Sequence, residues 1–459
     1  MAVTFSEALN RSRMHPFQWA IVATCMLVLV CDGIDLQLLG IVAPLVIDSF
    51  DTDSTTFGWA MGAALVGFGL GSWGGGWLGD TIGRRWTLAL AALVFSLATV
   101  GAGTSAGVWH MAGWRLLGGL GFGAAYANAL AMAGEWLPDR WRAVAVSTLS
   151  VGTPIGGTIV GWIGPDLAVA HGWPGTFTRI GLATLVLVAI IAAVLRDSPS
   201  FLLARGRREA ALRNARLVLR EDTELVPERH ETDAGDGPSV GVLHPSNTRV
   251  NTGIGLAFAA AALVAYSILS WSTVMLTERG FSLAAAGNAV AWAGITSMIG
   301  SIIVGLAMRR FGSRPVMLAL SGGLVVLLIA LGWAVEGLAP NPAVPPAQAQ
   351  QTLVTWLIGA AGGFFSAAIA GMYVMMTHAY PQSCRSAGIG FGIFMSRVGA
   401  IAATAFGGGL LALGGGSTIP FFAVLTLSAA VIAAAAFVVD RHVPSLAEAE
   451  RRRVAAAGA

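Results

Sequence analysis

Two aspartates lie three residues apart inside a long apolar run, in the stretch "VCDGIDLQLLG" from Val30 to Gly40. Asp32 and Asp35 are spaced i and i+3, so both carboxylates fall on one face of a helix, and Gly33 between them permits close approach of a second helix. The run 17–44 is about 40 Å long as a helix, which is enough to cross a hydrocarbon core of about 30 Å. A carboxylic acid inside a membrane costs about 2.5 to 3.5 kcal/mol, so it needs a partner, a proton or a wet cavity.

An arginine is expected within reach of these carboxylates. Counting residues inward along the predicted helices puts Asp35 about 14 Å deep, Asp32 about 18 Å and Arg115 about 10 Å from the same side. One interpretation is a static aspartate–arginine bridge between two helices. The other is a proton site, because two carboxyl groups on one face resist ionising together. Both interpretations stay open.

Arg397 is a second cation expected inside an apolar helix, about 15 Å from the start of that helix. A buried guanidinium favours an anionic ligand, because it binds a carboxylate through two parallel hydrogen bonds. Pairing of Arg397 with Asp32 or Asp35 is the alternative.

Composition defines the elements that must position these groups. The chain has 459 residues, of which 55% are hydrophobic, 11% are charged and 60 are glycine, and its mean hydropathy is +0.72. A soluble core cannot absorb such a chain, so the sequence predicts an all-α polytopic membrane protein. Apolar runs broken by short polar turns predict twelve spans, near 17–44, 57–78, 86–104, 108–134, 143–165, 176–196, 251–275, 284–308, 316–335, 350–376, 387–412 and 418–439.

The long hydrophilic segment between the sixth and seventh spans divides the chain six plus six. We therefore expect an N-terminal half over 1–196, a central loop over 197–250, a C-terminal half over 251–440 and a tail over 441–459. The stretch "ARGRREAALRNARLVLR" predicts a basic surface helix, and the acidic, Gly- and Pro-containing residues after it predict a solvated linker.

Positive charges indicate the orientation. The chain has no lysine, and nearly all of its 27 arginines fall on one side of the predicted spans. By the positive-inside rule that side is cytoplasmic, so we expect both termini in the cytoplasm and the protein in the inner (plasma) membrane. The first run is too long for a signal-peptide core and should be retained. The net charge of +3 reflects this topology and does not indicate nucleic-acid binding.

A glycine- and arginine-containing motif, "GWLGDTIGRR", lies between the second and third spans. It resembles the G-x-L-a-D-r-x-G-R-R signature of the major facilitator superfamily, whose fold has two six-helix halves around a central cavity. The resemblance implies an inner gate formed by Gly76, Asp80, Gly83, Arg84 and Arg85, with Thr81 where arginine is usual. The other interpretation is a basic turn that merely obeys the positive-inside rule.

A weaker copy of the motif, "GLAMRRFGSRP", lies between the eighth and ninth spans. Gly312 and Arg314 match Gly83 and Arg85 in kind, but Arg309 takes the place of the aspartate. The copy supports an internal duplication without symmetric gate chemistry.

Two further stretches of sequence indicate one family within that superfamily. "RLLGGLGFGAAYANALAMAGEWLPDRWR" and "YPQSCRSAGIGFGIFMSRVGA", together with Asp32-Gly33-x-Asp35, resemble motifs of the aromatic acid:proton symporter family, with Ala125 and Ala127 as departures. The resemblance adds Glu135 and Arg142 to the expected gate. Glu135 is expected to pair with arginines close to it in sequence, Arg140 and Arg142.

The resemblance implies proton-coupled uptake of a small aromatic carboxylate. Asp32 and Asp35 would couple the proton, and the substrate would contact Arg397, Arg115, Gln37, Tyr266, Trp292, Phe364 and Phe365, whose aromatic members could form a wall against a flat ring. We expect no cofactor besides the proton motive force. The partners would be the acid anion, protons and membrane lipid, and the protein would be a monomer.

Three other functions, those of an enzyme, a receptor and an efflux antiporter, would each require particular sequence features. An enzyme needs a nucleophile or a metal cluster, which the histidines and the three cysteines do not provide, so we expect no enzyme. A receptor would carry an added signalling domain, and we expect none because the tails are too short for one. "GTPIGG", residues 152–157, partly resembles an element of drug:proton antiporters, although Thr153 separates the glycine from the proline, and close helix packing explains it equally well. An efflux antiporter and a symporter of another organic acid anion remain the alternatives.

Overall fold

The structure, a computed structural model, describes residues 3–219, 225–227, 241–339, 341–380, 384–448 and 451. The described helices are α1 Phe5–Arg11, α2 Pro16–Ser49, α3 Ser54–Ile82, α4 Arg84–Ala102, α5 Val108–Trp136, α6 Asp139–Leu149, α7 Gly152–Val194, α8 Pro199–Ala204, α9 Arg208–Ala215, the 3-10 helix η1 Pro245–Asn247, α10 Thr248–Glu278, α11 Leu283–Phe311, α12 Ser313–Glu336, α13 Gln348–Ala379, α14 Arg385–Leu413 and α15 Ile419–Val438. Two short strands, β1 Val3–Thr4 and β2 Leu225–Val226, pair in parallel. The protein is therefore almost entirely helical.

Ten of the described helices are long and apolar enough to cross a membrane. Helix α3 is not among them, although it has 29 residues. Helix α7 counts once, although Gly172 has non-helical dihedral angles (φ 67°, ψ 168°) that divide its 43 residues into two segments. With α3 and the second segment of α7, each of the twelve predicted spans corresponds to a helical segment.

The fifth span differs from its prediction in one respect. A continuous span was expected over 143–165, but α6 ends at Leu149 and α7 begins at Gly152, so the helix is interrupted inside the span. The predicted basic helix of the central loop is also shorter, since α9 begins only at Arg208 after Gly206, which has a φ of 74°. The predicted linker lies largely outside the described residues.

The chain divides into two compact units. Unit 1 comprises Met1–Leu36, Val66–Gly156 and His171–Ala234, and unit 2 comprises Gln37–Leu65, Gly157–Ala170 and Gly235–Ala459. These boundaries fall inside α2, α3 and α7. The division of the chain at residue 196 by sequence order stays a prediction.

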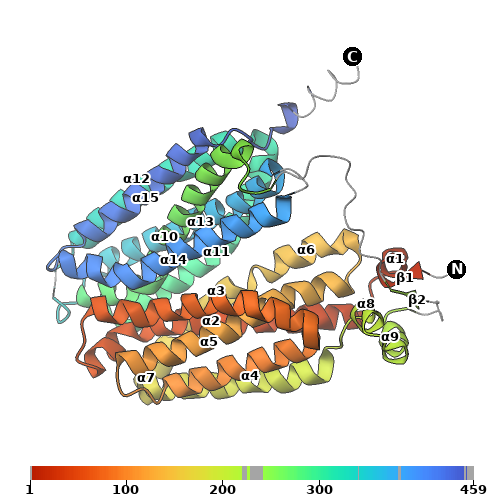
Figure 1. Cartoon of the computed structure of the whole chain (residues 1–459). Coiled ribbons are helices and arrows are strands. Elements are labelled where there is room, and N and C mark those ends of the chain that lie inside the picture. The colour runs from red at the N-terminus through yellow and green to blue at the C-terminus, as the bar shows by residue number, and fades with distance from the viewer. Residues whose placement is uncertain are drawn as a thin grey trace. The chain divides into compact units, whose positions relative to one another are not determined.

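Unit 1 has an apolar core that extends to the N-terminal residues. Phe5 and Leu9 of α1 are buried, and the Phe5 ring packs edge-on against Trp136 at a centroid distance of 5.7 Å. Figure 1 shows α1, β1, β2, α8 and α9 gathered at one end of this unit. The first residues of the chain and the first part of the central loop are thereby attached to the same helical core.

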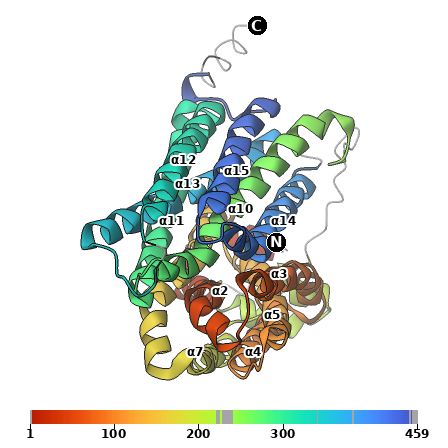
Figure 2. The same cartoon turned by 90° about the vertical axis from the view of Figure 1, so that its left-hand side faces the viewer.

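Unit 2 contains α10 to α15 as neighbouring helices (Figure 2) and also the segments of α2, α3 and α7 assigned to it. Where these segments meet α10, α11 and α14, glycines allow backbone contact. A Cβ atom would lie 2.4 Å from Ala405 O at Gly58, 2.0 Å from Ser54 O at Gly408 and 2.6 Å from Gly161 O at Gly287. We call Gly58, Gly161, Gly287 and Gly408, together with Gly40 opposite Ser270, the glycine seam.

Candidate functional site

An ion pair between α2 and α5 is the most deeply buried charge contact of unit 1. Arg115 Nη1 lies 2.6 Å from Asp35 Oδ2, and both side chains are 4% exposed. Arg115 Nη2 also donates to the Asp35 carbonyl oxygen at 3.2 Å, and the Thr99 hydroxyl donates to Asp35 Oδ1 at 2.8 Å. The structure thus joins two residues that the sequence predicted to meet. The threonine from α4 fixes the other carboxylate oxygen.

Asp32 lies in a different environment on the same helix. It is also buried, and its Oδ2 accepts a hydrogen bond from the Thr153 hydroxyl of α7 at 3.2 Å. Asp35 is therefore held by a guanidinium, and the Thr153 hydroxyl is one of the groups that contact Asp32. The two acids therefore have different neighbours on the same helix.

Arg397 of α14 lies in unit 2. Its Nη1 donates to the Tyr266 hydroxyl of α10 at 3.2 Å. Nearby on α13, the ring of Tyr373 packs edge-on against Phe258 at 5.1 Å. A guanidinium beside a phenol and aromatic rings is suited to an aromatic anion.

The other predicted substrate residues are distributed over unit 2. Gln37 is buried, and its Nε2 donates to Leu269 O at 3.3 Å, so it joins α2 to α10 near the glycine seam. The ring of Trp292 lies 5.2 Å from that of Trp356. Phe365 is buried, whereas Phe364 lies against Gly323 of α12. Their contact with a substrate stays a prediction.

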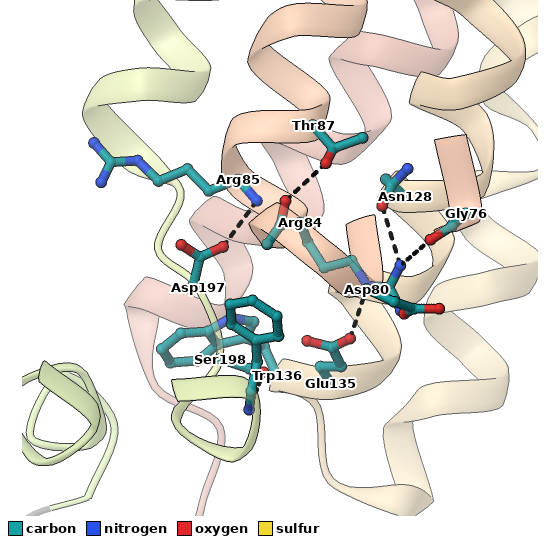
Figure 3. A network of polar contacts seen from close by, with 12 residues as sticks. Gly76, Asp80, Arg84, Arg85, Thr87, Asn128, Glu135, Trp136, Asp197 and Ser198 are labelled. Atoms are coloured by element: carbon teal, nitrogen blue, oxygen red, sulfur yellow. Dashed lines mark hydrogen bonds and ion pairs between the residues drawn. The ribbon is translucent and has the colours of Figure 1, made fainter. Parts of the chain in front are cut away.

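The predicted gate residues form a polar network around Arg84, at the end of unit 1 where α3 and α4 meet (Figure 3). Arg84 pairs with Asp80 one turn earlier, and its Nε donates to Glu135 Oε1 of α5 at 3.0 Å. Its Nη1 donates to Gly76 O at 3.3 Å and to Asn128 Oδ1 at 3.2 Å. One guanidinium therefore joins α3, α4 and α5.

The prediction for the partner of Glu135 was wrong. Glu135 pairs with Arg84, whereas Arg142 lies 3.0 Å from Asp139 Oδ1 and donates to Gly134 O. Arg140 donates to the Asn10 carbonyl oxygen at 3.1 Å. Sequence proximity misled the prediction, because α5 ends at Trp136 and the chain then changes direction, while Arg84 approaches from α4.

The turn between α3 and α4 is closed by the residues that follow α7. Gly83 has a φ of 101°, a conformation that favours glycine. Asp197 Oδ1 accepts from the Arg85 backbone N–H at 3.1 Å, as Figure 3 shows. The same oxygen lies only 2.5 Å from where a Cβ atom of residue 83 would be. Burial raises the pKa of the Asp197 carboxyl, against the opposing effects of that N–H and of the Arg85 and Arg207 charges.

The second copy of the turn, between α11 and α12, has the same backbone form with different partners. Gly312 has a φ of 84°, and the next residue, Ser313, exchanges hydrogen bonds with Val443 after α15. The Ser313 hydroxyl also lies 3.0 Å from His442 Nδ1. In each copy, the segment after the sixth helix of the repeat covers the glycine turn.

Sequence reasoning missed four residues of these clusters: Thr99, Asn128, Thr153 and Asp197. Three are uncharged and lie in apolar helices, where the sequence carries no signal for their partners. Thr153 stands out in the sequence only because it separates the glycine from the proline in the GTPIGG motif. That interruption is the one sequence signal for its role.

The fold and the two glycine turns define a many-helix membrane protein with an internal duplication. A family model described as the Major Facilitator Superfamily matches residues 25–344 and 252–458, so the chain belongs to that superfamily and is a transporter, not an enzyme.

Curated relatives cover most of the chain. It is 28% identical over 414 residues to the 4-hydroxybenzoate transporter PcaK of Pseudomonas aeruginosa, covering 88% of this chain and 89% of the relative. It is 27% identical to the gallate transporter of Pseudomonas putida (93% and 92% covered) and 25% identical to the benzoate transport protein of Acinetobacter baylyi (90% and 87%).

Solved structures show the same fold. A crystal structure of a D-xylose-proton symporter matches with a TM-score of 0.70 at 16% identity, covering 93% of this chain and 98% of that one. A bacterial homolog of the human lysosomal transporter Spinster, in an inward-facing and unoccupied conformation, matches with a TM-score of 0.70 at 15% identity, covering 93% and 97%. At this identity the likeness concerns the fold alone.

Proposed function

We propose that this protein is a secondary transporter that brings a small aromatic carboxylate into the cell together with protons. The carrying observation is the buried Asp35–Arg115 pair beside Asp32, which places two buried carboxyl groups inside the apolar helix α2. Acids in a membrane span are characteristic of proton pathways. The relatives named for 4-hydroxybenzoate, gallate and benzoate transport support the substrate class, because all three substrates are aromatic carboxylates.

Each site residue has a proposed task. Asp32 and Asp35 couple the proton, and Arg397, oriented by Tyr266, receives the substrate carboxylate. Arg115 holds Asp35 and assists with the anion. The network around Arg84 belongs to the inner gate, and rocking of two halves alternates access to the substrate. The termini would be cytoplasmic, the membrane the inner membrane and the protein a monomer.

Purified protein in liposomes tests this proposal. Labelled 4-hydroxybenzoate is the probe, and cyclohexanecarboxylate and benzyl alcohol are competitors that each lack either the aromatic ring or the carboxylate. An inward proton gradient should drive accumulation, an uncoupler should abolish it, and benzoate should compete better than either control compound.

Three outcomes would contradict the proposal. Accumulation without a proton motive force, or driven by sodium, would exclude proton symport. Equal competition by cyclohexanecarboxylate would show that the aromatic ring is not recognised and that the substrate class is organic acid anions in general. Export of cationic drugs without acid uptake would favour an antiporter.

A further inference from the structure

The interruption of the fifth span lies directly against Asp32. Helix α7 begins at Gly152 after α6 ends at Leu149, and its first described intrahelical bond runs from Ile155 N to Val151 O at 3.1 Å. The N–H groups of Gly152 and Thr153 therefore precede the regular hydrogen-bond ladder of α7. The positive end of the helix dipole lies at this first turn.

Two glycines press this first turn onto α2. A Cβ atom at Gly33 would lie 2.0 Å from Thr153 O, and one at Gly156 would lie 2.0 Å from Val30 O. Such distances permit only glycine at both positions, so the backbones of α2 and α7 touch on either side of Asp32. Close backbone contact consequently places the interruption beside Asp32 in this structure.

Thr153 is the side chain that joins the interruption to the carboxylate. Its hydroxyl donates to Asp32 Oδ2 at 3.2 Å. The described titratable and charged groups near Asp32 include Cys31 and Asp35 on α2 and Arg115 on α5, which is paired with Asp35. Since threonine does not titrate, its bond to Asp32 changes only when Asp32 itself gains or loses a proton.

We propose that Thr153 is a positioning residue that links the charge of Asp32 to the interruption between α6 and α7. The inference rests on the proposed proton coupling. A hydroxyl donates more strongly to a carboxylate than to a neutral carboxyl group, and the first turn of α7 likewise favours the negative charge. Protonation of Asp32 therefore loosens the first turn of α7 from α2 and frees α6 to move. Interrupted helices form the ion and substrate sites of several transporter folds.

The test compares Thr153→Val, which keeps the shape and removes the hydroxyl, with Thr153→Ser, which keeps the hydroxyl. Thr184→Val is the matched control, because Thr184 lies on the same helix and its hydroxyl donates to Gly181 O of that helix at 2.9 Å. Each variant is reconstituted in liposomes with labelled 4-hydroxybenzoate. Two rates are measured over a range of pH: proton-driven accumulation, and exchange of internal for external substrate at equal pH.

Thr153→Val should lose about tenfold in proton-driven accumulation, since a hydrogen bond to a charged group is of that order. Its exchange rate should stay within about twofold of the wild type, and the pH of half-maximal uptake should rise by about one unit, because the charged form of Asp32 has lost a donor. Thr153→Ser and Thr184→Val should behave as the wild type. Melting temperatures of the purified variants separate these effects from misfolding.

Failure of the proposed function and failure of this inference are distinguishable. A wild type whose uptake ignores the proton gradient would overturn the proposed function itself. A proton-driven wild type whose accumulation and pH profile are unchanged in Thr153→Val would overturn only the role of Thr153. Equal defects in the serine and valine variants would also overturn it, since packing and not the hydroxyl would then be responsible.

Discussion

Asp35 and Arg115 set the strongest constraint on single residues, because each neutralises the other where both side chains are only 4% exposed. Asp35→Asn should leave the Arg115 guanidinium buried without its counter-charge, at a cost of about 3 to 5 kcal/mol. The measurement is the melting temperature of purified protein, with Asp32→Asn as the matched control on the same helix, for which a smaller loss is expected.

The double variant Asp35→Asn, Arg115→Gln separates scaffold from proton site. Removing both charges should restore most of the stability, because no unpaired ion is left in the core. Proton-driven accumulation should stay absent if Asp35 takes part in coupling. Recovery of both stability and accumulation would show that the pair is a structural bridge only.

Arg397 offers a test of anion recognition at constant charge. Arg397→Lys keeps the positive charge but loses the planar fork that binds a carboxylate through two hydrogen bonds. We expect the KM for 4-hydroxybenzoate to rise at least about tenfold, and Tyr266→Phe, which removes only the phenol contact at 3.2 Å, to raise it less. An unchanged KM in Arg397→Ala would remove this residue from the site.

At the scale of elements, the turn between α3 and α4 depends on a carboxyl group whose pKa burial raises, Asp197. A raised pKa in the folded state means that the folded protein binds the proton more tightly than the unfolded chain does. The corresponding stability is present below the unfolded pKa of about 4 and is lost as the pH rises through the folded value.

Asp197→Asn tests the direction of this dependence of stability on pH. The amide oxygen can still accept from the Arg85 N–H, but the residue no longer titrates. We expect the wild type to gain stability relative to this variant as the pH is lowered from 7 to about 4, by thermal unfolding at each pH. Asp197→Ala, which removes the acceptor, should be destabilised by about 1 to 3 kcal/mol throughout. A relative loss of wild-type stability in acid would contradict the assignment.

The sequence predicted the elements better than their interruptions. Hydropathy locates a span because about 20 apolar residues are needed to cross the membrane, and this signal survives small errors at either end. The interruption before Gly152 and the division of α7 at Gly172 depend on single dihedral angles and on the glycine contacts with α2, which no hydropathy average resolves. The Asp35–Arg115 contact was predictable, since charges at similar depth in a membrane must find one another. The uncharged donor Thr99 had no such requirement.

At the scale of the whole molecule, the glycine seam of unit 2 joins segments of the first, second and fifth spans to helices of the second half. If transport requires these segments to separate, an added methyl group should disfavour only the joined state. Gly58→Ala and Gly161→Ala place a Cβ atom 2.4 Å from Ala405 O and 2.9 Å from Gly287 O. We expect a cost of about 1 to 3 kcal/mol to the joined state and a corresponding loss of transport.

Labelling of Ser270→Cys with a membrane-impermeant maleimide measures how often the seam is open, because Ser270 is buried opposite Gly40. Labelling should rise in both seam variants. Gly69→Ala and Gly322→Ala are controls, since each methyl group would meet open space. Gly71→Ala, which would clash with Leu120 O inside unit 1, should instead lower the melting temperature. Seam variants with unchanged labelling and transport would show that the seam does not open.

The small parallel sheet limits the number of membrane crossings that the chain can make between its two strands. Val3–Thr4 of β1 is hydrogen-bonded to Leu225–Val226 of β2, so both strands lie on the same face of the membrane. A chain that leaves one face and returns to it must cross an even number of times. Helices α2, α4, α5 and α7 each qualify once as a span by length and composition, which gives four crossings, so α3 and the remaining segment of α7 must be counted together or not at all. The parity that a two-residue strand pair imposes thus constrains the topology of the first 226 residues without reference to charge.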